Sequence, residues 1–255
     1  MRLEDKVILI TGSSTGIGEA TAERCLAEGA RVMIHGLDEA ETAETAGRLS
    51  QPYMVADLAL TESANTVIAK TIEYYGRIDG LVNNAASTAR SDLSSTHPDF
   101  FDQMIAINLR TPLFMIQAAV PHMKAQGKGA VVNIGSVNAY CGHPNLLDYS
   151  ISKGGLMTLT RNLANALAPD HIRVNQLNPG WTLSRNEIAL QISEGQPEDW
   201  YNQVSPRLAP TGRLLEPSEI AAHVVHWLSD ASAPASGVIY EVEQFPVIGR
   251  PGGGL

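Results

Sequence analysis

The stretch Thr11-Gly-Ser-Ser-Thr-Gly-Ile-Gly18 follows a short apolar run near the N-terminus. Gly12 permits a sharp turn, Gly16 lets the main chain approach a bound group, and Gly18 lets a following helix pack closely on the strand. A helix that begins near Gly16 would point its free N–H groups at anionic oxygens. Ordinary strand-to-helix turns also carry such glycines, but the position between a first strand and a first helix favours a dinucleotide site. We therefore predict that a dinucleotide pyrophosphate binds here.

Short apolar runs alternate with helical stretches along the rest of the chain. The runs are too short and too continuously apolar for amphipathic helices, which is typical of strands buried on both faces. The helical stretches Glu19–Glu28 and Ser63–Tyr75 each precede a glycine suited to a left-handed cap. This alternation predicts an α/β fold, a single Rossmann-type doubly wound parallel sheet of about seven strands with helices on both faces. The predicted strands are Lys6–Thr11, Arg31–His35, Tyr53–Ala56, Gly80–Asn83, Ala130–Ile134, Arg173–Leu177 and Val238–Val242.

No linker or repeat interrupts the pattern, so we expect residues 1–255 to form one dinucleotide-binding catalytic domain. The segment 181–211 fits neither strand nor helix periodicity, and its prolines, two tryptophans and mixed charge favour a substrate lid over a disordered excursion. The C-terminal tail 244–255 contains Phe245, Val247 and Ile248, which we expect to pack on a neighbouring subunit.

Composition excludes several classes of protein. The chain has 255 residues, and 18 Lys+Arg against 27 Asp+Glu give a net charge of −9, which argues against nucleic acid or an anionic membrane as partner. The start lacks the apolar region of a signal peptide, and we expect no membrane-spanning run. Cys25 and Cys141 lack the spacing of a metal site, so we expect free thiols, no metal and a cytoplasmic location.

The residues that would read the ribose lie about 20 positions beyond the glycines, in Ile34-His-Gly-Leu-Asp38. Position 36 has no acid for a 2′-hydroxyl, and Leu37 replaces the arginine that would meet a 2′-phosphate. Asp38 and Glu39 would repel a phosphate, so the sequence favours NAD over NADP. Asp38 fits two roles equally, contact with the cofactor or the N-cap of the next helix.

Tyr149-Ser-Ile-Ser-Lys153 places a phenol and an ammonium four residues apart, on one face of a helix. A positive charge about 4 Å away would lower the pKa of the phenol by about two or three units, enough for proton exchange near neutral pH. Such a pair is usually a plain helix surface, but Ser136 follows a strand at the same edge of the sheet. Its hydroxyl would donate to a carbonyl oxygen beside the tyrosine.

Asn108 lies within the predicted helix Asp99–Lys124, four residues before Pro112. Proline has no N–H, so the main-chain oxygen of Asn108 loses its helical partner. That oxygen would hold a water linked to Lys153. A kink that only serves packing is the alternative.

These residues resemble the classical short-chain dehydrogenases/reductases over about residues 5–243. The family's glycine motif is similar to Thr11–Gly18, and its Asn-Asn-Ala-Gly element is similar to Asn83–Ala86, with alanine at the last position. Its four catalytic residues correspond to Asn108, Ser136, Tyr149 and Lys153.

The resemblance implies a mechanism and a cofactor site. Tyr149 would be the acid/base, Lys153 would lower its pKa and hold the nicotinamide ribose, Ser136 would orient the substrate oxygen, and Asn108 would anchor a proton-relay water. Asp57 would contact adenine, and the segment after Asn178 would turn under the nicotinamide. The predicted cofactor residues are Gly12, Ser14, Thr15, Gly16, Ile17, Gly18, Leu37, Asp38, Asp57, Leu58, Asn84, Ala85, Tyr149, Lys153, Pro179, Gly180, Thr182 and Ser184.

We therefore expect an NAD(P)-dependent oxidoreductase that transfers hydride between nicotinamide and a secondary alcohol or ketone. Polar candidate walls, which include Ser87–Arg90 and Asn145, favour a small sugar, polyol or hydroxy acid as substrate. The family resemblance adds a homo-oligomer, dimer or tetramer. The alternative is a catalytically idle NAD(P)-binding sensor or scaffold. The predicted substrate residues are Ser136, Asn138, His143, Tyr149, Trp181 and Arg185.

Overall fold

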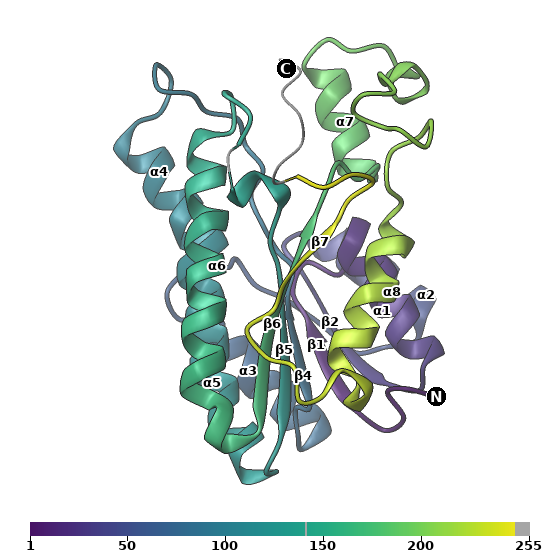
Figure 1. Ribbon diagram of the computed structural model, residues 1–255. Coiled ribbons are helices and arrows are strands. Elements are labelled where there is room, and N and C mark those ends of the chain that lie inside the picture. Colours follow the sequence, from purple (N-terminus) through teal and green to yellow (C-terminus); the bar gives the residue numbers. More distant parts are fainter. Residues whose placement is uncertain (141, 248–255) are drawn as a thin grey trace.

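Seven parallel strands form one sheet in the computed structural model, which describes residues 1–140 and 142–247 (Figure 1). The strand order is β3-β2-β1-β4-β5-β6-β7, and every neighbouring pair is parallel. All seven predicted strands are confirmed, whereas Cys141 and Ile248 lie outside the described residues. The strands are β1 Val7–Ile10, β2 Arg31–Gly36, β3 Tyr53–Val55, β4 Gly80–Asn83, β5 Gly129–Ile134, β6 Ile172–Pro179 and β7 Ile239–Val242.

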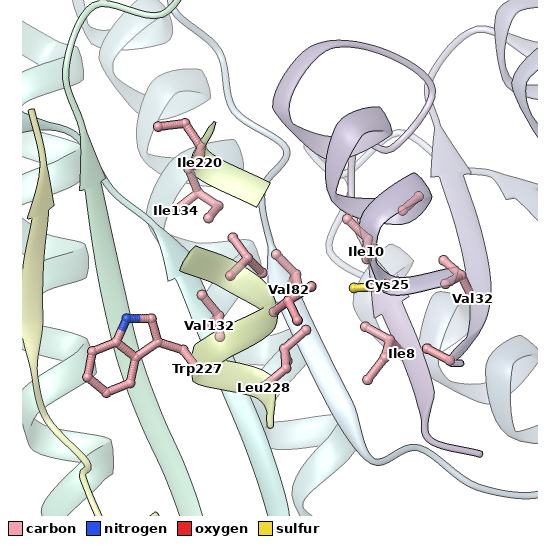
Figure 2. Packing of buried hydrophobic residues seen from close by; sticks show 14 of the residues in the cluster. Ile8, Ile10, Cys25, Val32, Val82, Val132, Ile134, Ile220, Trp227 and Leu228 are labelled. Carbon is pink, nitrogen blue, oxygen red and sulfur yellow. The ribbon is translucent and has the colours of Figure 1, made fainter. Parts of the chain in front are cut away.

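Helices cover both faces of the sheet, which confirms the doubly wound fold. One core cluster packs α1 and α8 on one face, with Cys25 of α1 near Ile8 and Ile10 and with Ile220 of α8 near Ile134 (Figure 2). The other cluster packs α3, α5 and α6 on the opposite face. The helices are α1 Gly16–Ala27, α2 Glu39–Leu49, α3 Ser63–Tyr75, α4 Pro98–Ile105, α5 Thr111–Ala125, α6 Leu147–Leu167, α7 Arg185–Ser193 and α8 Pro217–Leu228.

The strand order reverses at β1, which pairs with β2 on one side and with β4 on the other. In such sheets the side chains that bind ligands gather outside the carboxyl ends of the strands, at this switch point. Gly76 caps α3 with φ +73°, and Gly29 follows α1 with φ +87°, as their positions after helical stretches predict.

The run Pro98–Ala125 contains α4, a π-helical turn at Ala106–Arg110, and α5. It is long and apolar enough, by length and composition alone, to cross a membrane, with a mean hydropathy of 1.2, although we expected no such run. Met115, Ile116 and Met123 are buried in the core cluster that covers the sheet. The run therefore lies among the core helices of the fold.

The segment 181–211 forms α7 and a 3-10 turn at Trp200–Gln203 above the carboxyl ends of the strands (Figure 1). Trp181 and Trp200 stack with ring centroids 5.2 Å apart. Trp200 is buried together with Ala209 and Leu214 in a small cluster of its own. The tryptophans thus give the segment a packed interior, in line with the prediction of an ordered insertion.

A row of buried polar side chains crosses the interior from β4 to β6, and we call it the polar chain. Consecutive members are linked by side-chain hydrogen bonds of 2.7 to 3.0 Å. The last member, Asn178, also accepts from the main-chain N–H of Ser136 at 3.1 Å. The polar chain therefore connects the middle of the sheet to the edge where Ser136 lies. Its members are Asn83, Asn133, Thr160, Gln176 and Asn178.

Candidate active site

A cleft of about 1530 Å³ runs along the carboxyl ends of the strands. It extends from the glycine loop at β1 to the segment 181–211, so it passes the switch point of the sheet. Every predicted cofactor residue except Gly18 lines it, so residues far apart in sequence meet in one place. These lining residues are Gly12, Ser14, Thr15, Gly16, Ile17, Leu37, Asp38, Asp57, Leu58, Asn84, Ala85, Tyr149, Lys153, Pro179, Gly180, Thr182 and Ser184.

The glycine loop has the backbone that its sequence predicts. Gly12 and Gly16 adopt φ +62° and +60°, a region that side chains disfavour. A Cβ at Gly18 would overlap the carbonyl oxygen of Gly12, so this glycine is needed for close packing of α1 on the loop. Gly18 contributes space behind the cleft and does not line it.

The N-terminus of α1 faces the cleft with unsatisfied donors. Thr15 occupies the N-cap position, but its side chain makes no capping hydrogen bond. Its hydroxyl is also buried without a hydrogen-bond partner. A helix N-terminus with free N–H groups and an available hydroxyl fits the pyrophosphate of a dinucleotide.

Asn84 ties the end of β4 to the glycine loop. Its Nδ2 donates to the carbonyl oxygens of Thr11 and Gly12, both at 2.9 Å.

Among the described non-glycine residues, positive φ angles occur at Asp5, Ser50 and His171. Ala86 therefore has a backbone that alanine accommodates, and its departure from the family pattern is tolerated.

The outer end of the cleft is acidic. Asp38 is the N-cap of α2, since its carboxylate accepts from the N–H of Glu41 at 2.9 Å. Asp38 also lines the cleft, and its contact with the cofactor stays a prediction. His35 is buried, and its Nδ1 accepts from the N–H of Gly12 at 3.2 Å. Burial lowers the pKa of His35 to about 4, so a neutral imidazole holds the glycine turn.

Ser136, Tyr149 and Lys153 converge at the inner end of the cleft. The Ser136 side chain lies close enough to the Tyr149 hydroxyl to act on its pKa. The Lys153 ammonium lies 5.6 Å from the centre of the Tyr149 ring and donates to the carbonyl oxygen of Ile134 at 2.8 Å. One hydroxyl, one phenol and one ammonium thus share a small volume, as the spacing and the strand end predict.

The pKa of the phenol shifts opposite to our expectation. Burial of the hydroxyl raises the pKa of Tyr149 to about 12, although its hydrogen bond with Ser136 acts to lower it. Lys153 is 3% exposed, and burial lowers the pKa of its ammonium to about 8. The expectation that Lys153 lowers the phenol's pKa neglected the cost of burying both groups, which is the largest cause of both shifts.

Asn108 lies in the π-helical turn, just before Pro112, and its side chain is fully buried. Its amide accepts from the N–H of Ser87 at 2.8 Å and donates to the Ser87 carbonyl at 2.9 Å and to the Ser152 hydroxyl at 3.1 Å. Ile107, not Asn108, lines the cleft. The side chain thus fixes the loop after β4, and a water on its main-chain oxygen stays a prediction.

The predicted substrate residues divide into two groups. Asn138, His143 and Trp181 line the cleft, as do Ser136 and Tyr149. Arg185 does not line the cleft, because its exposed side chain forms an ion pair with Glu19 at 2.8 Å, and contact with a substrate stays an untested prediction. Arg185 is the first residue of α7, and its direction there depends on the orientation of the helix.

Glu187 is the main residue of the inner cleft that the sequence did not suggest. It lines the cleft, and its charge acts to raise the pKa of Tyr149. Its Oε1 accepts from the Trp181 indole and from the Gln191 amide, both at 2.9 Å. Ser184 is the N-cap of α7, so Glu187 lies in the first turn of the helix. Helical periodicity counted from that N-cap could have identified Glu187 as a cleft residue.

Arg90 connects the loop after β4 to α7. It lies 3.7 Å from a Glu187 oxygen and 3.1 Å from a Glu194 oxygen. The segment that contains α7 is therefore attached across the inner end of the cleft.

The beginning of the C-terminal tail belongs to the cleft of the same chain. Glu243 and Phe245 both line it, and Glu243 lies against Gly180. Phe245 is partly exposed in the cleft, and its packing on a neighbouring subunit stays a prediction. Packing of the rest of the tail on a neighbour stays a prediction.

Comparison with known proteins agrees with this geometry. The family model described as Enoyl-(Acyl carrier protein) reductase matches residues 12–244. The chain is 33% identical to a 3-oxoacyl-(acyl-carrier-protein) reductase of Thermotoga maritima, over 95% of this chain and 98% of the relative. It is 32% identical to a levodione reductase of Leifsonia aquatica, over 95% and 94%. The chain belongs to the short-chain dehydrogenase/reductase family.

The structures of this family share the fold. The L-sorbose reductase of Gluconobacter frateurii, complexed with NADPH and L-sorbose, has a TM-score of 0.89 and 27% identity, with 95% of this chain and 97% of that chain covered. The chain is accordingly an oxidoreductase of a family that uses NAD(P). Its cofactor preference, its substrate and the roles of its four candidate catalytic residues are proposals.

Proposed function

We propose that this protein is an NAD-preferring dehydrogenase/reductase that interconverts a secondary alcohol and a ketone on a small polyhydroxylated compound. The observation that carries the proposal is the meeting of Ser136, Tyr149 and Lys153 at one end of a cleft whose other end is the glycine loop. A binding module would need the loop but not this trio. An idle sensor or scaffold is therefore the weaker candidate.

The residues of the cleft divide the work of binding. The N–H groups at the start of α1 and the Thr15 hydroxyl would hold the pyrophosphate, and Lys153 would hold the nicotinamide ribose. A bound nicotinamide dinucleotide supplies the site that accepts or donates hydride. Thr182 and Ser184 line the cleft beyond Gly180, where they would bind the carboxamide.

Tyr149 exchanges the proton. Since its pKa is raised to about 12, the phenol is protonated at neutral pH and ready to donate to a ketone oxygen. The Ser136 hydroxyl, beside the phenol, would turn its single proton to the same substrate oxygen and donate a second hydrogen bond to it. In ketone reduction, the proton moves from the Tyr149 oxygen to the substrate oxygen as hydride reaches the substrate carbon. In alcohol oxidation, the proton moves from the substrate oxygen to the Tyr149 oxygen.

The inner cleft supports a polar substrate. Asn138, His143, Asn145, Glu187 and Gln191 line it, a set rich in groups that hydrogen bond to hydroxyls. The solved sorbose reductase, which carries a ketose, fits the same chemistry. A long acyl chain would leave these groups without hydrogen-bond partners. We therefore disfavour, for this protein, a 3-oxoacyl substrate of the kind named for the Thermotoga maritima relative.

The test is an assay of the purified protein with NAD(H) and NADP(H) against polyols, ketoses, hydroxy acids and a 3-oxoacyl thioester, followed through the absorbance of reduced nicotinamide. We expect turnover of a polyol or ketose, and a fall of about a hundredfold or more in kcat for Tyr149→Phe. Tyr74→Phe, at an exposed tyrosine outside the cleft, is the matched control. Unchanged turnover by Tyr149→Phe contradicts the assignment, and tight cofactor binding without any turnover favours the sensor.

We also propose that the chain forms a homo-oligomer, as its family resemblance implies. Leu113 and Phe114 of α5 and Ile151 of α6 are partly exposed apolar side chains on neighbouring helices. Light scattering measures the mass directly, and a monomer at all concentrations would contradict the proposal.

A further inference from the structure

The end of β2 has no room for an acidic side chain. A Cβ at Gly36 would overlap the Thr42 hydroxyl and would lie 3.0 Å from the Ser14 hydroxyl. Thr42 is a buried residue of α2, so this helix lies directly against the end of the strand. The glycine at position 36 therefore results from close packing, and any carboxylate that binds the ribose must come from another element.

Glu41, in the first turn of α2, brings a carboxylate to that place. The Ser14 hydroxyl donates to Glu41 Oε2 at 3.0 Å, which holds the acid beside the glycine loop. Both residues line the cleft, as does Gly36. The Ser14 bond uses one carboxylate oxygen and leaves Oε1 as a further acceptor.

The other carboxylates at this end serve the backbone. Asp38 accepts from the N–H of Glu41 at 2.9 Å, and Asp57 accepts from the N–H of Ala59 at 2.8 Å. Arg48, the cation on α2, points to α1, where it pairs with Glu23 at 2.6 Å. Among the described residues, neither lysine nor arginine joins the carboxylates at this end of the cleft.

We propose that Glu41 accepts a hydrogen bond from the 2′-hydroxyl of the adenosine ribose and is the residue that selects NAD over NADP. The inference rests on the proposed function, since it assumes a dinucleotide in this cleft. A 2′-phosphate adds about 1.5 to 2 negative charges, which Glu41 repels, and it removes the hydroxyl donor that Glu41 binds. Selection therefore comes from α2 in place of the missing acid at the end of β2.

The experiment measures binding, so it does not depend on catalysis. Calorimetric titrations use NAD⁺, NADP⁺, ADP-ribose and 2′-phospho-ADP-ribose, of which the last two lack nicotinamide. The variants are Glu41→Gln, which keeps the size of the side chain, and Glu41→Lys, which reverses its charge. Glu44→Gln, at an exposed position of the same helix outside the cleft, is the matched control. Thermal unfolding verifies that each variant is folded.

We expect the wild type to bind NAD⁺ and ADP-ribose more tightly than their 2′-phosphorylated forms. Glu41→Gln should reduce this ratio of dissociation constants by about ten- to a hundredfold, since the hydrogen bond from the 2′-hydroxyl then goes to a neutral amide oxygen and the repulsion of the 2′-phosphate is lost. Glu41→Lys should favour the phosphorylated ligands, and Glu44→Gln should leave the ratio unchanged.

An unchanged ratio in both Glu41 variants, with a wild type that favours NAD⁺, overturns the inference and leaves the proposed function in place. A wild type that favours NADP⁺ overturns the inference together with the NAD preference in the proposed function. Failure of the wild type to bind any of the four ligands overturns the proposed function itself. The two failures are thus distinguishable in one set of titrations.

Discussion

Replacing Lys153 with methionine should stabilise the folded protein at neutral pH, and this gain should shrink as the pH rises. Lys153 is 3% exposed, and burial lowers the pKa of its ammonium from 10.5 to about 8. Below about pH 8 the residue is charged in the folded and the unfolded chain, so folding carries the full cost of burying the charge. Between these two pKa values the unfolded chain holds one proton more, so wild-type stability rises with pH.

The gap between 8 and 10.5 corresponds to about 3 kcal/mol, because each pKa unit is worth about 1.4 kcal/mol. The methionine variant carries no such charge, although it also loses the hydrogen bond from Lys153 to the Ile134 carbonyl. The difference in free energy of unfolding between variant and wild type should therefore fall by about 2 kcal/mol or more between about pH 7 and pH 10.

Urea denaturation of both proteins at several pH values in this range measures the difference. Lys70→Met supplies the control, since Lys70 is an exposed residue of α3 and its pair with Glu73 is exposed as well. We expect that difference to stay flat. If the Lys153→Met difference is equally flat, Lys153 does not bear the cost of burial that we assign to it, and the reasoning fails.

Two further substitutions test the surroundings of the site. Asn108→Leu leaves the main-chain N–H and carbonyl of Ser87 without their hydrogen-bond partners. It should therefore lower the free energy of unfolding, measured by urea denaturation, by about 2 kcal/mol. A loss under about 0.5 kcal/mol would contradict the role of the Asn108 side chain in fixing this loop. Arg90→Ala removes the ion pairs that attach the loop after β4 to α7, worth about 1 kcal/mol together. Limited proteolysis within the segment 181–211 should become about fivefold faster, and an unchanged rate would show that these pairs do not hold it.

The elements of the fold could be predicted because their signals are local. Each strand is a short apolar run, and the caps at Gly29 and Gly76 need only one residue of the correct type. The glycine loop and the Tyr149–Lys153 pair are likewise spacings within one turn or one helix. Such patterns can be recognised within one short stretch of sequence.

The remaining parts of the site depend on how elements pack. The direction of Arg185 away from the cleft, and of Glu187 into it, follows from the orientation of α7, which sequence does not display. Glu41 gains its position only because α2 lies against Gly36. The pKa of Tyr149 was predicted from one neighbouring charge, whereas burial, a property of the whole surrounding structure, decides its sign.

The polar chain restricts how this sequence can drift. Asn83, Asn133 and Thr160 lie fully or almost fully buried, and each satisfies its neighbour. An apolar substitution at one position leaves the neighbouring donor or acceptor without a hydrogen-bond partner, which costs about 1 to 3 kcal/mol of stability. Replacing both partners together avoids that cost. The effect of a substitution in the polar chain therefore depends on the residue at the bonded position. We expect tolerated apolar substitutions to occur at both bonded positions together. Since the row ends at the main-chain N–H of Ser136, we expect a substitution at Asn83, the last residue of β4, to alter the position of Ser136 through this row.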